Sequence, residues 1–234
     1  MDAVHLEILP QPDDYTCGPT CLQAIYRYFE DKLPLEQVIR ETGRLDEGGT
    51  LAAWLGSHAL ERGYRATIYT YNLRLFDPTW FRPEGADLVR KLRTQLEFKE
   101  SAKFITATDA YLGFLEHGGE VRMQDLTRSL IRKYLTRGTP ILAGLSSTYL
   151  YQSAREWGDN WDADDVRGIP QGHFVVLCGY DRTTKMVRVA DPYLNNPHAP
   201  SENYYIVPVD RVICAILLGV LTYDANLLIL KPRK

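Results

Sequence analysis

The spacing of apolar residues changes along this chain, and that change limits the folds that the chain can adopt. In the first half, apolar residues recur every three or four positions, as at Leu22, Ile25, Tyr26 and Phe29, which is the spacing of an amphipathic helix. After Gly138, short apolar or alternating runs bounded by turn residues dominate, and these are typical of strands. Helices followed by antiparallel strands predict an α+β fold with two lobes and an active site in the cleft between them.

The same patterns predict the individual elements, with an irregular stretch at 72–85 and a hairpin turn at 180–185. Helices are predicted from Cys17 onward and at 35–42, 50–62 (capped by Thr50), 86–96, 108–116, 124–136 and 209–219. Strands are predicted at 5–9, 65–71, 141–145, 173–179, 186–191, 204–207 and 227–230.

The chain has no internal repeat and no low-complexity linker. Its 234 residues are 45% hydrophobic and 24% charged, which is ordinary for a globular protein with a substantial core. We therefore expect residues 1–234 to form a single domain. In it, a helical lobe spans about 12–138. The β lobe spans about 139–234 and includes an N-terminal strand.

Charge and hydropathy argue against some partners. The formal net charge of -3 implies no basic face, so nucleic acid is not an expected partner. The longest apolar run, at 212–221, is too short to span a bilayer, and the first ten residues lack the basic start of a secretory signal. These features predict a cytoplasmic protein without a membrane partner. They do not predict its oligomeric state.

The string from Gln11 to Cys21 suggests a nucleophile, because Cys17 lies where the first helix begins. Free N–H groups and the helix dipole favour an anion at that place, so they should stabilise the thiolate, which is the nucleophilic form. The same N–H groups can hold the oxyanion that forms on an attacked carbonyl. Pro19 fits in the first turn, where its missing N–H costs nothing.

Other interpretations of this thiol remain open on the residues alone. Cys21 lies one turn further into the helix on the same face and is the competing nucleophile. The spacing from Cys17 to Cys21 is one residue too long for a thioredoxin-type motif. A zinc site would need two further ligands, for which Cys178 and His173 are the candidates, and no second close pair exists. Cys17 can also be an ordinary buried cysteine.

A cysteine nucleophile needs a histidine base, and His173 is the best placed of the five because it begins an apolar strand directly after a glycine. If that strand pairs with the next one so that Val175 faces Val189 and Leu177 faces Val187, His173 falls opposite Asp191 on the same face. Asp191 would then orient the imidazole. A structural histidine and an ordinary Asp-Pro turn remain the alternatives.

Taken together, these segments resemble the double-glycine leader peptidases, which process bacteriocins and belong to the papain-like cysteine peptidase superfamily. The resemblance implies a papain-like fold and no cofactor or metal. It also implies that Cys17 is the nucleophile, that His173 is the general base and acid, that Asp191 orients it, and that the amide of Gln11 lines the oxyanion hole. The spacing from Gln11 favours Cys17 over Cys21. Long additions at 72–119 and 146–171 mean that the leader-peptide substrate is not carried over.

The resulting hypothesis is cleavage of a peptide or small amide through an acyl-enzyme. The alternatives are acyl or γ-glutamyl transfer on the same scaffold and a non-catalytic peptide-binding protein. The acidic segment at 156–165, with Trp157 and Trp161, directly precedes His173 and should lie near the cleft. It is either a lid that attracts a substrate amine or basic side chain, or a solvated loop.

Overall fold

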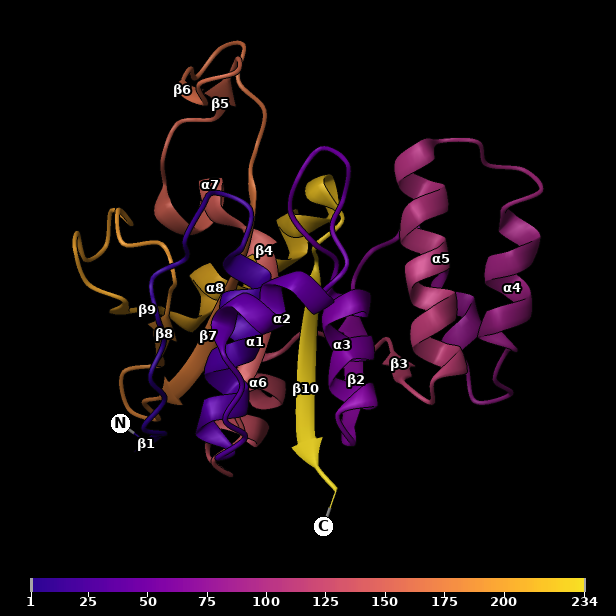
Figure 1. The fold of residues 1–234 in the computed structure, drawn as a ribbon, viewed down its shortest axis with the longest axis horizontal. Coiled ribbons are helices and arrows are strands. Elements are labelled where there is room, and N and C mark those ends of the chain that lie inside the picture. Colours follow the sequence, from indigo (N-terminus) through magenta and orange to yellow (C-terminus); the bar gives the residue numbers. More distant parts are fainter. Residues whose placement is uncertain (1, 234) are drawn as a thin grey trace.

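A computed structural model describes residues 2–233, and its helices cover both faces of a central, mainly antiparallel sheet (Figure 1). The predicted α+β class is confirmed. In spatial order the strands are β3 (Glu120–Arg122), β2 (Tyr64–Thr70), β10 (Asn226–Pro232), β4 (Ile141–Ser146), β7 (Gly172–Tyr180), β8 (Met186–Ala190) and β9 (Tyr204–Pro208). The short β1 (Asp2–Ala3) also pairs with β7, and only β2 and β3 among these described strands run parallel.

The sheet joins the two halves of the chain. β2 comes from the helical first half, yet it pairs along its whole length with β10, which ends the second half. β4 and β7 lie at the centre and are buried along almost all of their length. Because helices cover both faces, these strands are continuously apolar rather than alternating.

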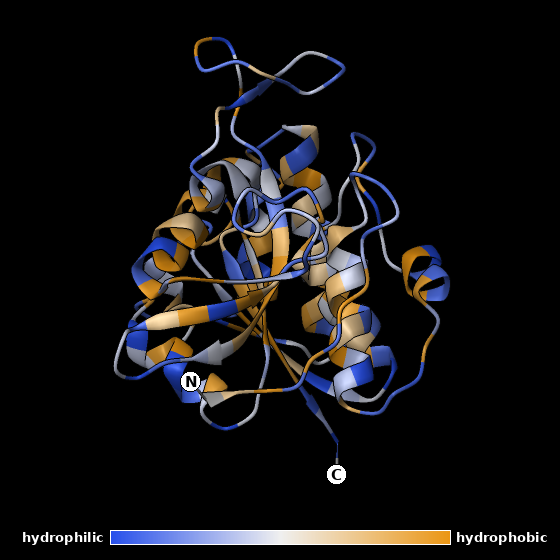
Figure 2. Cartoon of the chain, turned by 90° about the vertical axis from the view of Figure 1, so that its left-hand side faces the viewer, coloured by the Kyte–Doolittle hydropathy of each residue, from blue (hydrophilic) through white to orange (hydrophobic). Residues whose placement is uncertain are grey.

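The helices form two layers. On one face lie α1 (Cys17–Tyr28), α2 (Leu35–Glu41), α3 (Ala52–Glu61) and α5 (Ala102–Glu116), with α4 (Leu88–Gln95) against α5. On the other face lie α6 (Arg128–Leu135), α7 (Ser147–Tyr151) and α8 (Val209–Leu218). Two short 3-10 helices, η1 (Pro78–Phe81) and η2 (Gly219–Thr222), lie in the connections. The hairpin of β5 (Glu156–Trp157) and β6 (Asp162–Ala163) projects from the body of the molecule (Figures 1 and 2).

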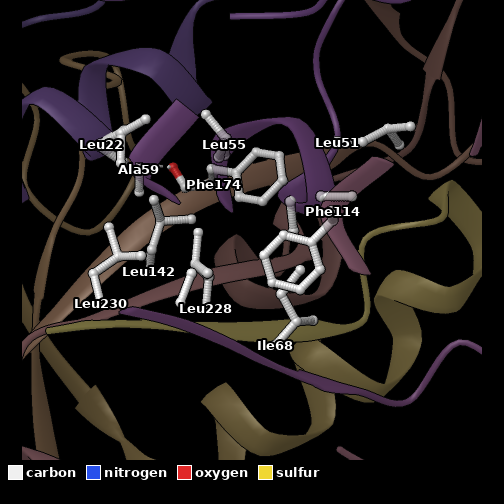
Figure 3. Close-up of a cluster of buried hydrophobic side chains, with 14 of the residues drawn as sticks. Leu22, Leu51, Leu55, Ala59, Ile68, Phe114, Leu142, Phe174, Leu228 and Leu230 are labelled. Atoms are coloured by element: carbon white, nitrogen blue, oxygen red, sulfur yellow. Dashed lines mark hydrogen bonds between the residues drawn. The ribbon is translucent and has the colours of Figure 1, made fainter. Parts of the chain in front are cut away.

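The alternation of side chains along β7 divides the core into these two layers. Phe174 and Val176 pack toward α1, whereas Val175 and Leu177 pack toward α6 and α8. Figure 3 shows Phe174 among side chains from α1, α3, α5 and the neighbouring strands. Each fully buried leucine or phenylalanine contributes about 1.5–3 kcal/mol to stability, so the layer that contains Phe174 holds α1 firmly against β7.

The N-terminal segment corrects one prediction, because 5–9 forms no strand and β1 precedes it. Leu6 and Ile8 are buried in the predicted alternation. However, the backbone of this segment bonds to a side chain rather than to a neighbouring strand. The Tyr204 hydroxyl accepts from the Ile8 N–H at 3.1 Å and donates to the Leu6 carbonyl at 2.8 Å.

Helix starts also differ from prediction in α3, α5 and α6 and, by two residues, in α4, which begins at Leu88 rather than at 86. α3 begins at Ala52, and Thr50 does not cap it but donates its hydroxyl to the Gly43 carbonyl at 2.6 Å. α6 begins at Arg128 rather than 124, because the Thr127 side chain accepts from the Leu130 N–H and fixes the start there. α5 begins at 102 rather than 108, so the sequence pattern did not reveal residues 102–107 as helical.

The register between β7 and β8 differs from the predicted one by two residues. Leu177 faces Val189 rather than Val187, and Val187 faces Tyr180. A β-bulge after Leu177 separates these pairs and absorbs an extra residue of β7, which the sequence pattern does not reveal. From His173 to Leu177 the shift is two, so these side chains keep their predicted faces, because side chains alternate with a period of two. After the bulge the shift is three, and Tyr180 packs on the same face as Val175 and Leu177.

Candidate active site

Cys17 is the first residue of α1, and its side chain lines a cavity of about 850 Å³. Thr16 precedes it with a non-helical backbone, so the helix begins at the thiol itself. The first N–H groups of a helix have no acceptor within the helix and point toward its N-terminal end. The predicted helix start is therefore correct, and the thiol lies beside free N–H donors.

Gly18 allows this helix start to approach the sheet closely. A Cβ atom there would lie 2.4 Å from the Thr50 Cγ2 atom and 3.3 Å from the Phe174 ring. Phe174 directly follows His173 in β7, so the packing that excludes a side chain at Gly18 also brings α1 to the beginning of β7. A side chain at this position would move Cys17 away from His173.

His173 and Asp191 form a buried pair, as the sequence predicts. His173 Nε2 lies 2.8 Å from Asp191 Oδ1, and the two residues are 8% and 0% exposed. The observed register, continued past the end of β8, places Asp191 opposite Val175 rather than opposite His173. The pair therefore forms diagonally, which is within the reach of long side chains on one face.

Asp191 accepts four hydrogen bonds, which hold its carboxylate in place. Its Oδ1 atom accepts from His173 and from the Tyr193 N–H at 2.9 Å, and its Oδ2 atom accepts from the hydroxyls of Tyr151 and Tyr205, each at 2.7 Å. Burial would raise the pKa of Asp191, but attraction to His173 and these hydrogen bonds lower it below its ordinary value. Sequence reasoning missed both tyrosines, because nothing in the local pattern of α7 or β9 points to them.

His173 has interactions on both sides of its ring. Burial would lower the pKa of His173, but the charge of Asp191 and a hydrogen bond and charge interaction with Cys17 outweigh burial and raise that pKa to about 10. Because Nε2 is engaged by Asp191, Nδ1 is the ring nitrogen that remains for the thiol. The ring thus lies between the carboxylate and Cys17.

The other cysteines occupy different surroundings. Cys21 is fully buried, donates its thiol to the Phe174 carbonyl at 3.3 Å, and has its pKa raised well above the ordinary value by burial. Burial also raises the pKa of Cys178 to about 11, and Cys214 is exposed on α8. Within residues 2–233, Cys17 is therefore the thiol that lines the cavity, and the sequence argument against Cys21 agrees with this placement.

Gln11 lines the same cavity as Cys17 and His173. Its backbone N–H donates to the Pro192 carbonyl at 2.9 Å, which ties this segment to the residue after Asp191. Its Nε2 atom donates to the Asp13 carbonyl at 2.8 Å, and an amide has a second N–H that remains available. Its Oε1 atom is buried and has no partner within the described chain.

The acidic segment that precedes His173 lies at the edge of the cavity. Glu156 and Trp161, from the β5–β6 hairpin and its turn, contribute to the lining. Asp164 instead binds within its own loop, where it accepts from the Val166 and Arg167 N–H groups and pairs with the Arg167 side chain. Asp224 also lines the cavity, and no sequence pattern pointed to it.

Two further properties of the described residues bear on the kind of site. No group of three or more His, Cys, Asp or Glu side chains in residues 2–233 is arranged to hold a metal ion. In the same part of the chain, no helix has the length and apolar character needed to cross a membrane.

Several solved structures are similar in fold. A putative C39-like peptidase from Bacillus anthracis is 12% identical and has a TM-score of 0.52, with 99% of this chain and 96% of that chain covered. The double glycine motif protease from an AMS/PCAT transporter is 15% identical, with a TM-score of 0.48 and coverage of 99% and 94%. The peptidase domain of Streptococcus ComA is 12% identical, with a TM-score of 0.45 and coverage of 98% and 100%. The B. anthracis structure has the same fold as this chain.

The sequence itself matches a family. No curated protein matches it, but residues 87–207 match the model of the Peptidase_C39 like family, and this segment is just over half of the chain. The segment contains His173 and Asp191, whereas Cys17 and Gln11 precede it. With the family match and the shared fold together, the chain belongs to the Peptidase_C39 like family and is a cysteine-type peptidase with a papain-like fold.

Proposed function

We propose that the chain hydrolyses a peptide or small amide bond through an acyl-enzyme, with Cys17 as nucleophile, His173 as general acid and base, and Asp191 as the orienting residue. One observation carries the proposal: Cys17 and His173 line one cavity at the start of α1, while Asp191 holds His173 from behind at 2.8 Å. We also propose that the whole chain is one domain, because β2 and β10 join its two halves in a single sheet.

The first half of the reaction forms a thioester. The Cys17 sulfur attacks the carbonyl carbon, and the charge that develops on the oxygen is held by the Cys17 N–H and the free N–H of the Gln11 amide. The protonated His173 gives its proton to the leaving nitrogen, the C–N bond breaks, and the amine departs. Asp191 stabilises the charged imidazole before that transfer.

The second half releases the acid. Neutral His173 takes a proton from a water molecule, whose oxygen attacks the thioester carbonyl. The C–S bond then breaks and the carboxylic acid departs, while His173 keeps the proton that it took from water, so the thiolate and imidazolium pair re-forms. The raised pKa of His173 supports this cycle, because the imidazolium is the stable form whenever the thiolate is present.

Alkylation by iodoacetamide, followed by peptide mass spectrometry, tests this assignment. We expect Cys17 to be modified before the other three thiols and to react below pH 7, because the charged His173 stabilises its thiolate. His173→Ala should slow modification of Cys17 about tenfold or more, since the thiolate loses its partner.

His117→Ala is the matched control, because His117 is exposed at the end of α5 and bonds only to the Gly113 carbonyl among described residues. This variant should react like the wild type. Preferential modification of Cys21, or an unchanged rate in His173→Ala, would contradict the assignment.

A further inference from the structure

Asp224 is a carboxyl group in the cavity that the proposed mechanism does not use. It lies between η2 and β10, and it lines the cavity together with Cys17 and His173. The residue is only 7% exposed. Gly172, the residue before His173, gives it room, because a Cβ atom there would lie 2.1 Å from Asp224 Oδ2. The backbone at the start of β7 and this carboxyl are therefore in close contact.

The hydrogen bonding of Asp224 is incomplete. Its Oδ2 atom accepts from the Thr222 hydroxyl at 2.6 Å, and within residues 2–233 its Oδ1 atom has no hydrogen-bond partner. A buried carboxylate ordinarily accepts several hydrogen bonds or pairs with a cation, as Asp191 does. An unpaired oxygen in the wall of a cavity is placed to accept from a group that enters the cavity.

The groups that face Asp224 come from three elements. Lys103 and Tyr111 lie on α5, His173 on β7 and Thr222 on η2. Burial raises the pKa of Asp224 to about 7, although Thr222, Lys103 and His173 each act to lower it. The two cations are engaged elsewhere, since Lys103 pairs with Glu47 at 2.5 Å and His173 pairs with Asp191.

The cavity lining holds more acidic than basic side chains, because its Lys103 already pairs with Glu47, which also lines the cavity. Asp14 and Glu156 line it, and neither forms an ion pair within the described part of the chain. Burial and the nearby Asp14 raise the pKa of Glu156. Asp14, Glu156 and Asp224 thus leave the cavity with an excess of acceptors for a positively charged ligand.

We propose that Asp224 binds a positively charged group of the substrate, so that the cavity selects peptides carrying a guanidinium or ammonium group near the scissile bond. The group is either an arginine or lysine side chain or a free amino terminus. This proposal deepens the proposed function and rests on it, because the bound group is a part of the substrate only if the chain is a peptidase that acts at this cavity. The binding site itself is defined by Asp224, its free Oδ1 atom and the acidic cavity wall.

Equilibrium binding to the Cys17→Ala variant tests the site without requiring catalysis. At pH 8, acetyl-arginine amide should bind about tenfold more tightly than acetyl-citrulline amide, its neutral isostere, as expected for a charge-assisted hydrogen bond. The double variant with Asp224→Asn should lose this preference. The double variant with Asp109→Asn should keep it, because Asp109 is an exposed carboxylate of α5 outside the cavity lining.

The preference should weaken as the pH falls below about 7, since Asp224 becomes protonated there. Glycinamide compared with acetylglycinamide distinguishes a free amino terminus from a side chain as the source of charge. Equal binding of both members of each pair, or an arginine preference that survives in Asp224→Asn, would overturn the proposal.

Cleavage of a mixed peptide library, read by mass spectrometry, then connects the site to activity. Wild type should cut about tenfold more often near arginine or lysine, or near a free amino terminus, and Asp224→Asn should lose this selectivity whereas Asp109→Asn retains it. Absence of any cleavage that depends on Cys17 would refute the proposed peptidase mechanism and leave the binding result to decide on Asp224. Cleavage that depends on Cys17 but has no preference for charge would refute the role of Asp224 alone.

Thermal unfolding separates a binding role from a structural one. The folded pKa of Asp224 lies above its ordinary value of 3.8, so stability falls as the pH rises from about 4 to about 7 and ionisation is forced on a buried group. Asp224→Asn should therefore raise Tm at pH 8 by about 5 °C, and the gain should disappear near pH 4. A lower Tm at pH 8 would indicate that the carboxylate is held by structural contacts, and it would count against the proposal.

Discussion

Replacing Cys17 by alanine should lower the rate of peptide cleavage by about 10⁴-fold or more, because no acyl-enzyme can then form. The fold should be unaffected, since the thiol lies at the cavity wall and the change removes one sulfur atom. The measurement is the rate of cleavage of a peptide library, with circular dichroism and Tm to show that the variant is folded.

Cys21→Ser is the matched control for this experiment. Cys21 lies one turn further along α1, and a serine hydroxyl can keep the hydrogen bond that the thiol donates to the Phe174 carbonyl. We expect this variant to retain most of its activity and to lose about 1 kcal/mol of stability, because a polar hydroxyl replaces a buried thiol. If Cys21→Ser were inactive and Cys17→Ala active, the two cysteines would have to exchange roles.

Asp191→Ala should destabilise the fold by about 3–5 kcal/mol as well as reduce activity, because it removes a fully buried charge that has several partners. The change leaves the hydroxyls of Tyr151 and Tyr205, the Tyr193 N–H and the His173 ring without an acceptor. Each buried donor left unpaired costs about 1–3 kcal/mol, so several losses act together. Chemical denaturation followed by tryptophan fluorescence measures the change.

The effect of Asp191 on stability should depend on pH in a defined direction. The folded pKa of Asp191 lies below its ordinary value, so its stabilising contribution is complete above that ordinary value and is lost as the pH falls through the lowered folded pKa. The difference between wild type and Asp191→Ala should therefore be largest near neutral pH and shrink in acid. A difference that grows in acid would show that this carboxyl group is not held in its ionised form.

Asp210→Ala provides the control for removal of a carboxylate. Asp210 pairs with Arg128 on the surface, and both side chains are more than half exposed. An exposed ion pair contributes about 0–1 kcal/mol, so this variant should be close to wild type in stability and activity. A large loss in Asp210→Ala would mean that the assay does not distinguish buried from surface carboxylates.

Together these variants test two separate functions of residues at the cavity, which are the chemistry and the choice of peptide. Cys17, His173 and Asp191 form one connected set on α1, β7 and the end of β8, and the proposed chemistry depends on it. Asp224 lies beside the Gly172 backbone, and within residues 2–233 its side chain accepts a hydrogen bond only from the Thr222 hydroxyl. We expect loss of the first set to stop cleavage and loss of Asp224 to change which peptides are cleaved.

The elements around the site show which of its features a local sequence pattern can predict. The start of α1 at Cys17 and the strand that carries His173 could be predicted, because helix starts and apolar strands depend on the types and spacing of adjacent residues. The face shared by His173 and Asp191 was also predictable, since it depends only on the period of two. The predicted face is correct although the predicted register is wrong by two residues, because a shift of two does not change the face.

The sequence by itself thus determined the α+β class, the helix start at Cys17 and the face on which His173 and Asp191 meet. Only the tertiary structure decided the diagonal geometry of that pair, the two tyrosine hydroxyls that fix Asp191, and the place of Asp224 in the cavity wall. These features join residues from α7, β9 and the η2–β10 connection that are far apart in the chain. Their proximity follows from the folded sheet and from burial, and neither leaves a periodic trace in the local sequence.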